Sequence, residues 1–383
     1  MDNFYFQNPC KIIFGKNTIL KIGPEIKKYG YSKVLLIAGQ GSIKKNRVYD
    51  QTIKSLKEAK IEWVEVWGVQ PNPVLSKVRE AIRLAWKEKP EAILAVGGGS
   101  VIDSAKAVSA GYYLDDIWQA FEGKVQIEKA LPIFTILTLS ATASEMNQWA
   151  VISNEQERKK WAIGAGCLIP QVSIIDPSVQ TTLPWHQTVN GAIDGLSHLM
   201  ENYFLGRDEE TSMALCEALM RSIIISTDQL QRAPEDYNAR SNLVWAITMA
   251  HNGVSAIGLK GGDWSAHRIE HGISAIHPEV AHGEGLAVVF PAWILYMHKS
   301  NPKTFQRWAE TVWEARNVFS AVKKMRTKYR KWRAPIWLND LKINQKEIKQ
   351  IVKNVMQFKN LGVLKRLTKK DVEEILKLAR AVE

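Results

Sequence analysis

Cysteine is scarce in this chain of 383 residues. The three cysteines, Cys10, Cys167 and Cys216, lie far apart, and no Cys-x-x-Cys pair occurs among them. An odd number of widely spaced cysteines provides no disulfide framework. The sequence is therefore expected to belong to a reduced, cytoplasmic protein.

Long apolar runs are also missing. No run approaches the roughly 18 apolar residues that suggest a membrane-spanning helix. Residues 1–9 contain neither a basic stretch nor an apolar core of the kind found in a secretory signal peptide, so none is expected. Low-complexity tracts and long internal repeats are absent as well. The sequence predicts a globular protein that is long enough for two domains, each with its own core.

Acidic residues are outnumbered by basic ones, and the formal net charge is +12. Such an excess raises the hypothesis of a nucleic-acid-binding protein. The densest basic run, residues 323–333, has helical spacing, and its Tyr329 and Trp332 are expected to pack inward. No nucleic-acid-binding signature accompanies the run. A solvated helix face explains it better, and nucleic-acid binding remains a remote alternative.

Tryptophan, in contrast, is abundant, with 14 residues. Many of these tryptophans occupy positions where apolar residues recur at helical spacing. We therefore expect most of them in the core, including Trp86, Trp245, Trp293 and Trp313.

The first half of the chain alternates short apolar runs with helical patterns. Helices are expected at about 48–59 and 75–87, and a hairpin is expected around the polar tip at 154–160. Buried strands are expected at residues 34–38, 62–66, 92–96, 132–138 and 172–176. Strands separated by helices indicate βαβ crossovers and a mostly parallel sheet.

After residue 183 nearly the whole sequence has helical spacing. Breaks are expected at 233–234, 261–262 and 301–302, and a capped helix start at Thr368. The predicted fold class is an α/β N-terminal dinucleotide-binding domain, residues 1–183, followed by an all-α C-terminal domain, residues 184–383.

Four residues of the helical half are candidate metal ligands. Asp194 and His198 are four residues apart, so on a helix they lie on one face and can reach one ion. Four of the eight histidines fall between residues 267 and 282, which favours a metal site over a chance distribution. The predicted ligands are Asp194, His198, His267 and His282. One carboxylate and three imidazoles suit Fe²⁺ or Zn²⁺.

A run of three glycines, Gly97, Gly98 and Gly99, directly follows the expected strand at 92–96 and precedes a helical pattern. Here a pyrophosphate can approach bare backbone N–H groups and the positive end of a helix dipole. Ser100 is a candidate N-cap, and Asp103 stands where a capping-box acid would lie. A tight turn alone is the alternative explanation, but three glycines exceed what a turn requires. The loop is neither a Rossmann fingerprint nor a Walker loop.

A second candidate loop, residues 39–42, follows the strand at 34–38. In dinucleotide sites an acid near these strand ends holds the ribose hydroxyls and repels a 2′-phosphate. Here small and neutral residues are followed by Lys44, Lys45 and Arg47. This composition favours NADP(H) over NAD(H).

Taken together, the motifs resemble the iron-containing (group III) alcohol dehydrogenases, and among them the butanol-dehydrogenase-like aldehyde reductases. The matching pieces are the 97–106 glycine loop with its Asp103 and Lys106, Ser144-Glu145, Asp176-Pro177, the Asp194/His198 pair, and His267/His271 with His282-Gly283. The resemblance spans nearly the whole chain. It implies a dehydroquinate-synthase-like fold, with the active site in the cleft between the two domains, and a homodimer.

The resemblance also implies roles for individual residues. Asp194, His198, His267 and His282 match the metal ligands, and His271 matches a histidine beside the nicotinamide that could relay a proton. A fifth ligand or an outer-shell group are the alternatives for His271. The expected cofactor contacts are Gly39, Gly41, Ser42, Asn72, Gly97, Gly98, Gly99, Ser100, Asp103, Thr138, Thr142, Lys160 and Leu183.

Two departures from the family pattern stand out. The spacing from His267 to His282 is one residue longer than the family has, and the loop at 276–279 is expected to absorb the insertion. His277 is therefore a rival for the place of His282. Ala143 also stands in a turn that is usually richer in glycine.

The sequence thus predicts a metal-dependent oxidoreductase that transfers a hydride between NADP(H) and a small primary alcohol or aldehyde. A zinc protease is excluded, because Arg268 occupies the position where the His-x-x-x-His motif of those enzymes needs a glutamate. Polyol oxidation of the glycerol dehydrogenase kind and a dehydroquinate-synthase-like lyase are the alternatives on the same fold. The apolar and glycine-rich region at 245–265 favours an uncharged substrate over the phosphorylated acid of the lyase.

Overall fold

The computed structural model describes residues 1–381. The chain divides into two compact units. The α/β unit contains Gln7–Leu183 and Pro234–Val244, and the helical unit contains Met1–Phe6, Pro184–Ala233 and the chain from Trp245 onward. A single division between residues 183 and 184 therefore assigns two short segments differently, Met1–Phe6 and Pro234–Val244.

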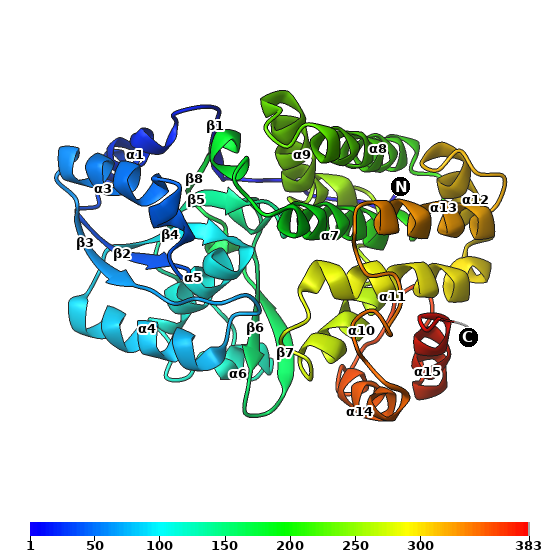
Figure 1. Cartoon of the computed structure of the whole chain (residues 1–383). Coiled ribbons are helices and arrows are strands. Elements are labelled where there is room, and N and C mark those ends of the chain that lie inside the picture. Colours follow the sequence, from blue (N-terminus) through cyan, green and yellow to red (C-terminus); the bar gives the residue numbers. More distant parts are fainter. Residues whose placement is uncertain (382–383) are drawn as a thin grey trace. The chain divides into compact units, whose positions relative to one another are not determined.

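The α/β unit is built on a six-stranded parallel sheet with the order β1-β8-β5-β4-β2-β3 (Figure 1). Its strands are β1 (Lys11–Phe14), β2 (Lys33–Ala38), β3 (Glu62–Val66), β4 (Ala92–Gly98), β5 (Ile133–Leu139) and β8 (Val172–Ile175). A separate antiparallel hairpin consists of β6 (Trp149–Asn154) and β7 (Lys159–Gly164). The helices of this unit are α1 (Ile22–Lys28), α2 (Ser42–Lys45), α3 (Val48–Glu58), α4 (Leu75–Glu88), α5 (Gly99–Gly111) and α6 (Trp118–Phe121).

Helices cover both faces of this sheet. Val34 and Leu36 belong to a core that includes residues of α1 and α3, whereas Leu35 and Ile37 belong to a core that includes residues of α4 and α5. Because neighbouring residues of a strand point to opposite faces, both sides of β2 are buried. This double burial explains why the strands appear in the sequence as continuous apolar runs.

The expected strands and the hairpin are confirmed to within a few residues. The sequence did not reveal β1, the strand at the sheet edge. Its four residues include Lys11, and both ends of the strand are exposed, so it lacks the apolar run of a buried strand. The fold class is confirmed.

The helical unit is built from helices of 10 to 23 residues. These are α7 (Trp185–Tyr203), α8 (Glu210–Arg232), α10 (Ser265–Ser274), α11 (His282–Met297), α12 (Pro302–Thr311), α13 (Val318–Lys331), α14 (Gln345–Val355) and α15 (Lys369–Leu378). A further helix, α9 (Tyr237–Ala250), is shared between the units, with Val244 as its last residue in the α/β unit. The predicted breaks and the capped start at Thr368 are confirmed. Within residues 1–381, none of the helices has the length and apolar character needed to span a bilayer.

The tryptophan prediction is correct for Trp293 and Trp313, which are buried, and wrong for Trp86 and Trp245, which are 43% and 40% exposed. Trp86 lies on the outer side of α4, where its indole N–H donates to the carbonyl of Tyr112. Helical spacing identified an apolar position without showing whether another element covers it.

The basic run at 323–333 is helical, as predicted. It forms most of α13, and Tyr329 and Trp332 are completely buried. Lys328 pairs with Asp228 of α8 at 2.5 Å. The run is thereby explained by packing within the helical unit.

The start of α15 is fixed by the carboxylate of Asp371. This group accepts hydrogen bonds from the backbone N–H of Thr368 at 2.6 Å and from its hydroxyl at 2.7 Å. The other oxygen faces the Lys365 ammonium at 2.8 Å and the hydroxyl of Tyr296. Partial burial opposes the charge, but these donors outweigh it and hold the pKa of Asp371 well below its ordinary value.

We predict that Asp371→Asn destabilises the protein at neutral pH by about 1–3 kcal/mol, because charged hydrogen bonds are lost. A carboxylate whose pKa is lower in the folded state stabilises the protein above its unfolded pKa of about 3.9 and loses this effect as the pH falls. The difference between Asp371→Asn and the unchanged protein should therefore shrink in acid. Urea unfolding at several pH values measures it, and a difference that persists unchanged at low pH would contradict this assignment.

Candidate metal centre and cofactor-binding region

Asp194 and His198 occupy one face of α7, one turn apart. The Nε2 atom of His198 lies 3.6 Å from Oδ1 of Asp194, and both side chains are buried. The position of α7 is set by the apolar residues around them, since Ile193, Leu196 and Leu199 are buried as well. The helix thus brings a carboxylate and an imidazole together inside the helical unit.

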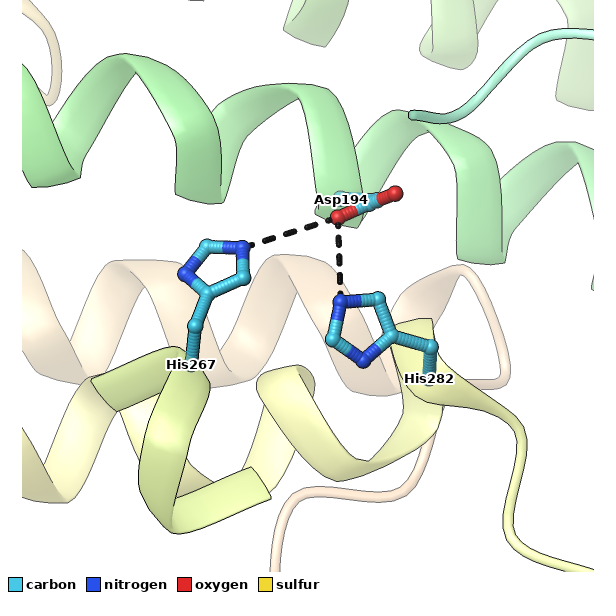
Figure 2. Close-up of side chains that lie close together, drawn as sticks. All are labelled: Asp194, His267 and His282. Carbon is cyan, nitrogen blue, oxygen red and sulfur yellow. Dashed lines mark ion pairs between the residues drawn. The ribbon is translucent and has the colours of Figure 1, made fainter. Parts of the chain in front are cut away.

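Two further imidazoles point toward the same carboxylate. Figure 2 shows the rings of His267, from α10, and His282, from the first residue of α11, directed at Asp194. Their Nε2 atoms lie 3.8 and 3.6 Å from Oδ1 of Asp194. Three imidazole nitrogens therefore surround one carboxylate oxygen.

These distances are too long for hydrogen bonds. Oδ1 of Asp194 and Nε2 of His267 are both buried and have no hydrogen-bond partner within the described residues 1–381. Buried polar atoms without partners are rare in proteins, and each requires an explanation. A cation held between the carboxylate and the imidazoles supplies one, because both of these atoms would then be ligands. The residues present fit Fe²⁺ or Zn²⁺.

The electrostatics of the cluster also favour a cation. Burial opposes the charge of Asp194, yet His198, His282 and His267 hold its pKa well below its ordinary value. Burial likewise lowers the pKa of His267, but Asp194 and Glu201 outweigh it and raise that pKa to about 9. Burial lowers the pKa of His198. The cluster thus favours a positive charge on His267 and disfavours one on His198.

His277, the rival to His282, lies in a different environment. Its Nδ1 atom faces Glu279 at 3.2 Å and its Nε2 atom faces Glu347 at 3.3 Å. The geometry therefore favours His282 as the fourth member of the cluster. The start of α11 lies next to α7.

A glycine makes the position of His282 possible. A Cβ atom on Gly283 would lie 2.5 Å from the carbonyl oxygen of Asn190 on α7. Since that neighbour is backbone and cannot move aside, the first turn of α11 can approach α7 this closely only with glycine at this position. The His-Gly pair in the sequence is thereby explained.

His271 lies one turn after His267 on α10. Its ring centre is 5.4 Å from that of His282, and potential ligand atoms of Glu270, His271 and His282 all lie within 4.8 Å of one another. It does not belong to the group of nitrogens around Asp194. This position suits a group beside the metal better than a ligand of it.

The structure adds residues to the site that the sequence did not reveal. Glu201 contacts His267, Glu270 contacts His282, and the ring of His251 stacks on that of His198 with centres 4.4 Å apart. Glu201 was detectable, because Asp194, His198 and Glu201 recur at helical spacing on one face. Nothing in the sequence pattern connects His251 with the four predicted ligands.

The predicted cofactor contacts lie in the α/β unit, and the two glycine loops among them follow the carboxyl ends of β2 and β4. The chain leaves β2 toward β3 on one side and continues from β4 to β5 and β8 on the other. The point between β2 and β4 is therefore a topological switch point, where parallel sheets bind dinucleotides. Residues 39–42 follow β2, and Gly97 and Gly98 end β4, so both predicted loops border this point.

The glycines of the loop at 97–99 have a packing role. A Cβ on Gly97 would lie 2.5 Å from a methyl group of Val101, and a Cβ on Gly99 would lie 2.5 Å from the hydroxyl of Thr142. Packing therefore accounts for two of the three glycines without a ligand. The first turn of α5 receives no hydrogen bond from a capping side chain, so its N–H groups could still face a phosphate.

The expected cap of α5 is wrong. Gly98 is the N-cap, and Ser100 lies inside the helix. Asp103 is buried and accepts hydrogen bonds from the hydroxyl of Ser144 at 2.7 Å and the backbone N–H of Val151 at 3.0 Å. Close packing requires glycine at this turn. The helix therefore starts before Ser100, the residue that suggested a cap.

The other predicted contacts remain predictions. Thr138 is a buried residue near the end of β5. Leu183 is the last residue of the segment Gln7–Leu183 of the α/β unit. The ammonium of Lys160 donates to the side-chain oxygen of Asn72 at 2.9 Å. Ala143 has a left-handed backbone with φ of +51°, which explains why a glycine is suited to this turn.

Comparison with known proteins assigns both parts of the chain to one family. The model of the iron-containing alcohol dehydrogenases matches residues 9–177, and the model of the C-terminal part of the Fe-containing alcohol dehydrogenase family matches residues 188–380. The chain belongs to the iron-containing alcohol dehydrogenase family. It is therefore an NAD(P)- and metal-dependent alcohol dehydrogenase, and the resemblance seen in the sequence is confirmed.

Several members of the family are similar over their full length. A probable NADH-dependent butanol dehydrogenase from Bacillus subtilis is 36% identical, covering 98% of this chain and 99% of its own. The NADPH-dependent aldehyde reductase YqhD from Escherichia coli is 32% identical over 93% of both. The crystal structure of an NADH-dependent butanol dehydrogenase from Thermotoga maritima superposes with a TM-score of 0.97 at 51% identity, covering 100% of this chain and 99% of that one.

We predict that His282→Ala weakens metal binding in this alcohol dehydrogenase and that His277→Ala does not. Loss of a ligand should cost at least the factor of about 10–100 that is typical for partners of ligands. Metal content after equilibration with a limiting chelator measures the effect. If His277→Ala lost the metal while His282→Ala kept it, the histidine facing Glu347 would be the ligand instead.

Proposed function

We propose that this chain interconverts small primary alcohols and aldehydes with NAD(P)(H), using Fe²⁺ or Zn²⁺ held by Asp194, His198, His267 and His282. The observation that supports the proposal most directly is the approach of three imidazole nitrogens to one unpartnered, buried oxygen of Asp194. A bound divalent ion would supply a Lewis acid that polarises an aldehyde carbonyl or lowers the pKa of an alcohol.

The protein residues contribute placement and proton transfer. Asp194 and the three histidines would hold the metal ion in an environment with little water, where electrostatic effects are strong. His271 is proposed to exchange a proton with the substrate oxygen, since it lies beside His282 without belonging to the group around Asp194. The loop at 97–100 and the first turn of α5 are proposed to receive the pyrophosphate.

A small, uncharged substrate fits the composition of residues 245–265, which are largely apolar and glycine-rich. The names of the relatives, butanol dehydrogenases and an aldehyde reductase, support the same class. We therefore propose straight-chain aliphatic aldehydes such as butanal as substrates for reduction.

NADPH is the proposed hydride donor. Residues 39–47 contain no acid and carry Lys44, Lys45 and Arg47, all exposed. Lys44 lies over the ring of Trp67 at 4.2 Å, so Lys45 and Arg47 are the cations that could face a 2′-phosphate. The relatives differ in this respect, being named for NADH or for NADPH. The ratio of kcat/KM for the two cofactors decides, and equal or better use of NADH would refute this part of the proposal.

We predict that the purified protein oxidises NADPH in the presence of butanal and that this activity depends on a bound metal. Exhaustive chelation should abolish it, and refilling with Fe²⁺ or Zn²⁺ should restore it, because no side chain of the cluster replaces a Lewis acid. Absorbance of the reduced nicotinamide measures both steps. Activity that survives verified metal removal would contradict the mechanism.

We predict that His271→Asn lowers kcat by about 10²–10⁴-fold, the usual contribution of a positioned acid or base. Its metal content should stay unchanged. His298→Asn is a matched control, because His298 lies at the end of α11 and contacts Leu295 and Phe319. A loss of metal in His271→Asn would show that His271 is a ligand, and an unchanged kcat would show that it does not transfer the proton.

A further inference from the structure

Two buried glutamates contact two histidines of the cluster on the side of the ring that faces away from Asp194. Glu201 of α7 accepts from Nδ1 of His267 at 2.7 Å, and Glu270 of α10 is paired with Nδ1 of His282. Both glutamates are completely buried. In each case the opposite nitrogen, Nε2, is the one that faces Asp194.

A carboxylate at Nδ1 has a defined chemical effect. It holds the proton on Nδ1, so the lone pair of Nε2 is available to a metal, and it fixes the plane of the ring. It also makes the imidazole a stronger donor. A glutamate that merely filled space in the bundle would not need to face this one nitrogen.

Glu201 connects α7 with the chain at the start of α10. One carboxylate oxygen accepts from the backbone N–H of His267 at 3.2 Å as well as from its ring, and the other accepts from the backbone N–H of Trp264. Its carbonyl oxygen accepts from the N–H of Asp263 at 3.1 Å. Trp264 has a left-handed backbone with φ of +59°, which is unfavourable for a bulky residue. The contacts of Glu201 hold the chain in this conformation directly before His267.

Glu270 connects α10 with α11 in a similar way, through its contact with His282. The space for its side chain is provided by Gly285 of α11, where a Cβ would lie 2.6 Å from Cγ of Glu270. Thus α7 carries the carboxylate that orients the histidine of α10, and α10 carries the carboxylate that orients the histidine of α11. His198 differs, because its ring stacks between those of His251 and His267, at 4.4 and 5.0 Å.

We infer that Glu201 and Glu270 are positioning residues of the metal centre, each acting through one histidine. This inference rests on the proposed ligand set. It goes beyond that set by assigning the affinity of the centre in part to two residues that never touch the ion. Their removal should weaken metal binding although all four ligands remain.

Glu201→Gln and Glu270→Gln test the inference. The amide preserves the size of the side chain but removes the charge and leaves a single acceptor oxygen, so Glu201→Gln cannot serve both His267 and Trp264. Glu217→Gln is the matched control. Glu217 is also a buried glutamate of the bundle, accepting from the hydroxyl of Tyr203 at 2.7 Å and from Arg307 at 2.6 Å, and it does not contact the cluster.

The dissociation constants of Zn²⁺ and Co²⁺, measured by competition with a chelator, are the readout. Each test variant should bind about 10–100-fold more weakly than the unchanged protein, and Glu217→Gln should stay within about twofold. The visible absorption of bound Co²⁺, which reports ligand geometry, should change in the test variants alone. If Glu201→Gln fails to fold, Glu201→Asp, which keeps the charge but withdraws it from His267, takes its place.

A loss smaller than about tenfold in both test variants, or an equal loss in Glu217→Gln, would overturn the inference. The proposed ligand set fails in a different way. In that case the unchanged protein itself would bind neither metal tightly, and His282→Ala would make no difference. The two failures are thus distinguished by the unchanged protein.

Discussion

Burial of the Asp194 carboxylate is the constraint on which the metal centre depends. A charged group removed from water inside a helical bundle carries a large cost unless opposite charge or hydrogen bonds compensate it. No donor contacts its Oδ1 within residues 1–381, and three imidazole nitrogens lie 3.6–3.8 Å away. A positive charge on His267 is favoured here, since Asp194 and Glu201 raise the pKa of that histidine against the effect of burial. A divalent ion would meet this demand better than a proton, because it could bind several of these groups at once.

The packing of three helices follows from this requirement. The imidazoles reach one oxygen because α11 begins against α7 and α10, and glycines at 283 and 285 remove the Cβ atoms that would prevent this approach. The carboxylates of Glu201 and Glu270 then join α7 to α10 and α10 to α11. Two more carboxyl groups are buried as a result. Ligands, glycines and outer carboxylates therefore form one interdependent arrangement.

The sequence predicted those parts of the molecule in which one physical effect dominates locally. Strands β2 and β3 were found within a residue of their ends, since double burial produces continuous apolar runs. Strand β1 was missed, because an edge strand of four residues has no such run. The exposure of Trp86 and the N-cap of α5 at Gly98 were not predicted, because both depend on tertiary neighbours. Asp194 and His198 were accessible through helical spacing, whereas Glu270 has the sequence appearance of any polar helix residue until its neighbour on α11 is known.

The glycine loop and the metal centre, on which the proposed function rests, differ in what supports them. At the glycine loop, Val101 and Thr142 already require the absence of side chains at 97 and 99, so glycine there has an explanation without any ligand. At the metal centre no such packing explanation exists, because apolar neighbours cannot compensate buried carboxylates. The position of the loop at the switch point between β2 and β4 is what distinguishes it from an ordinary tight turn. A polarising ion alone suits hydrolysis as well as redox chemistry, and a phosphate-binding loop alone suits many nucleotides. Their occurrence in one chain narrows the chemistry to hydride transfer.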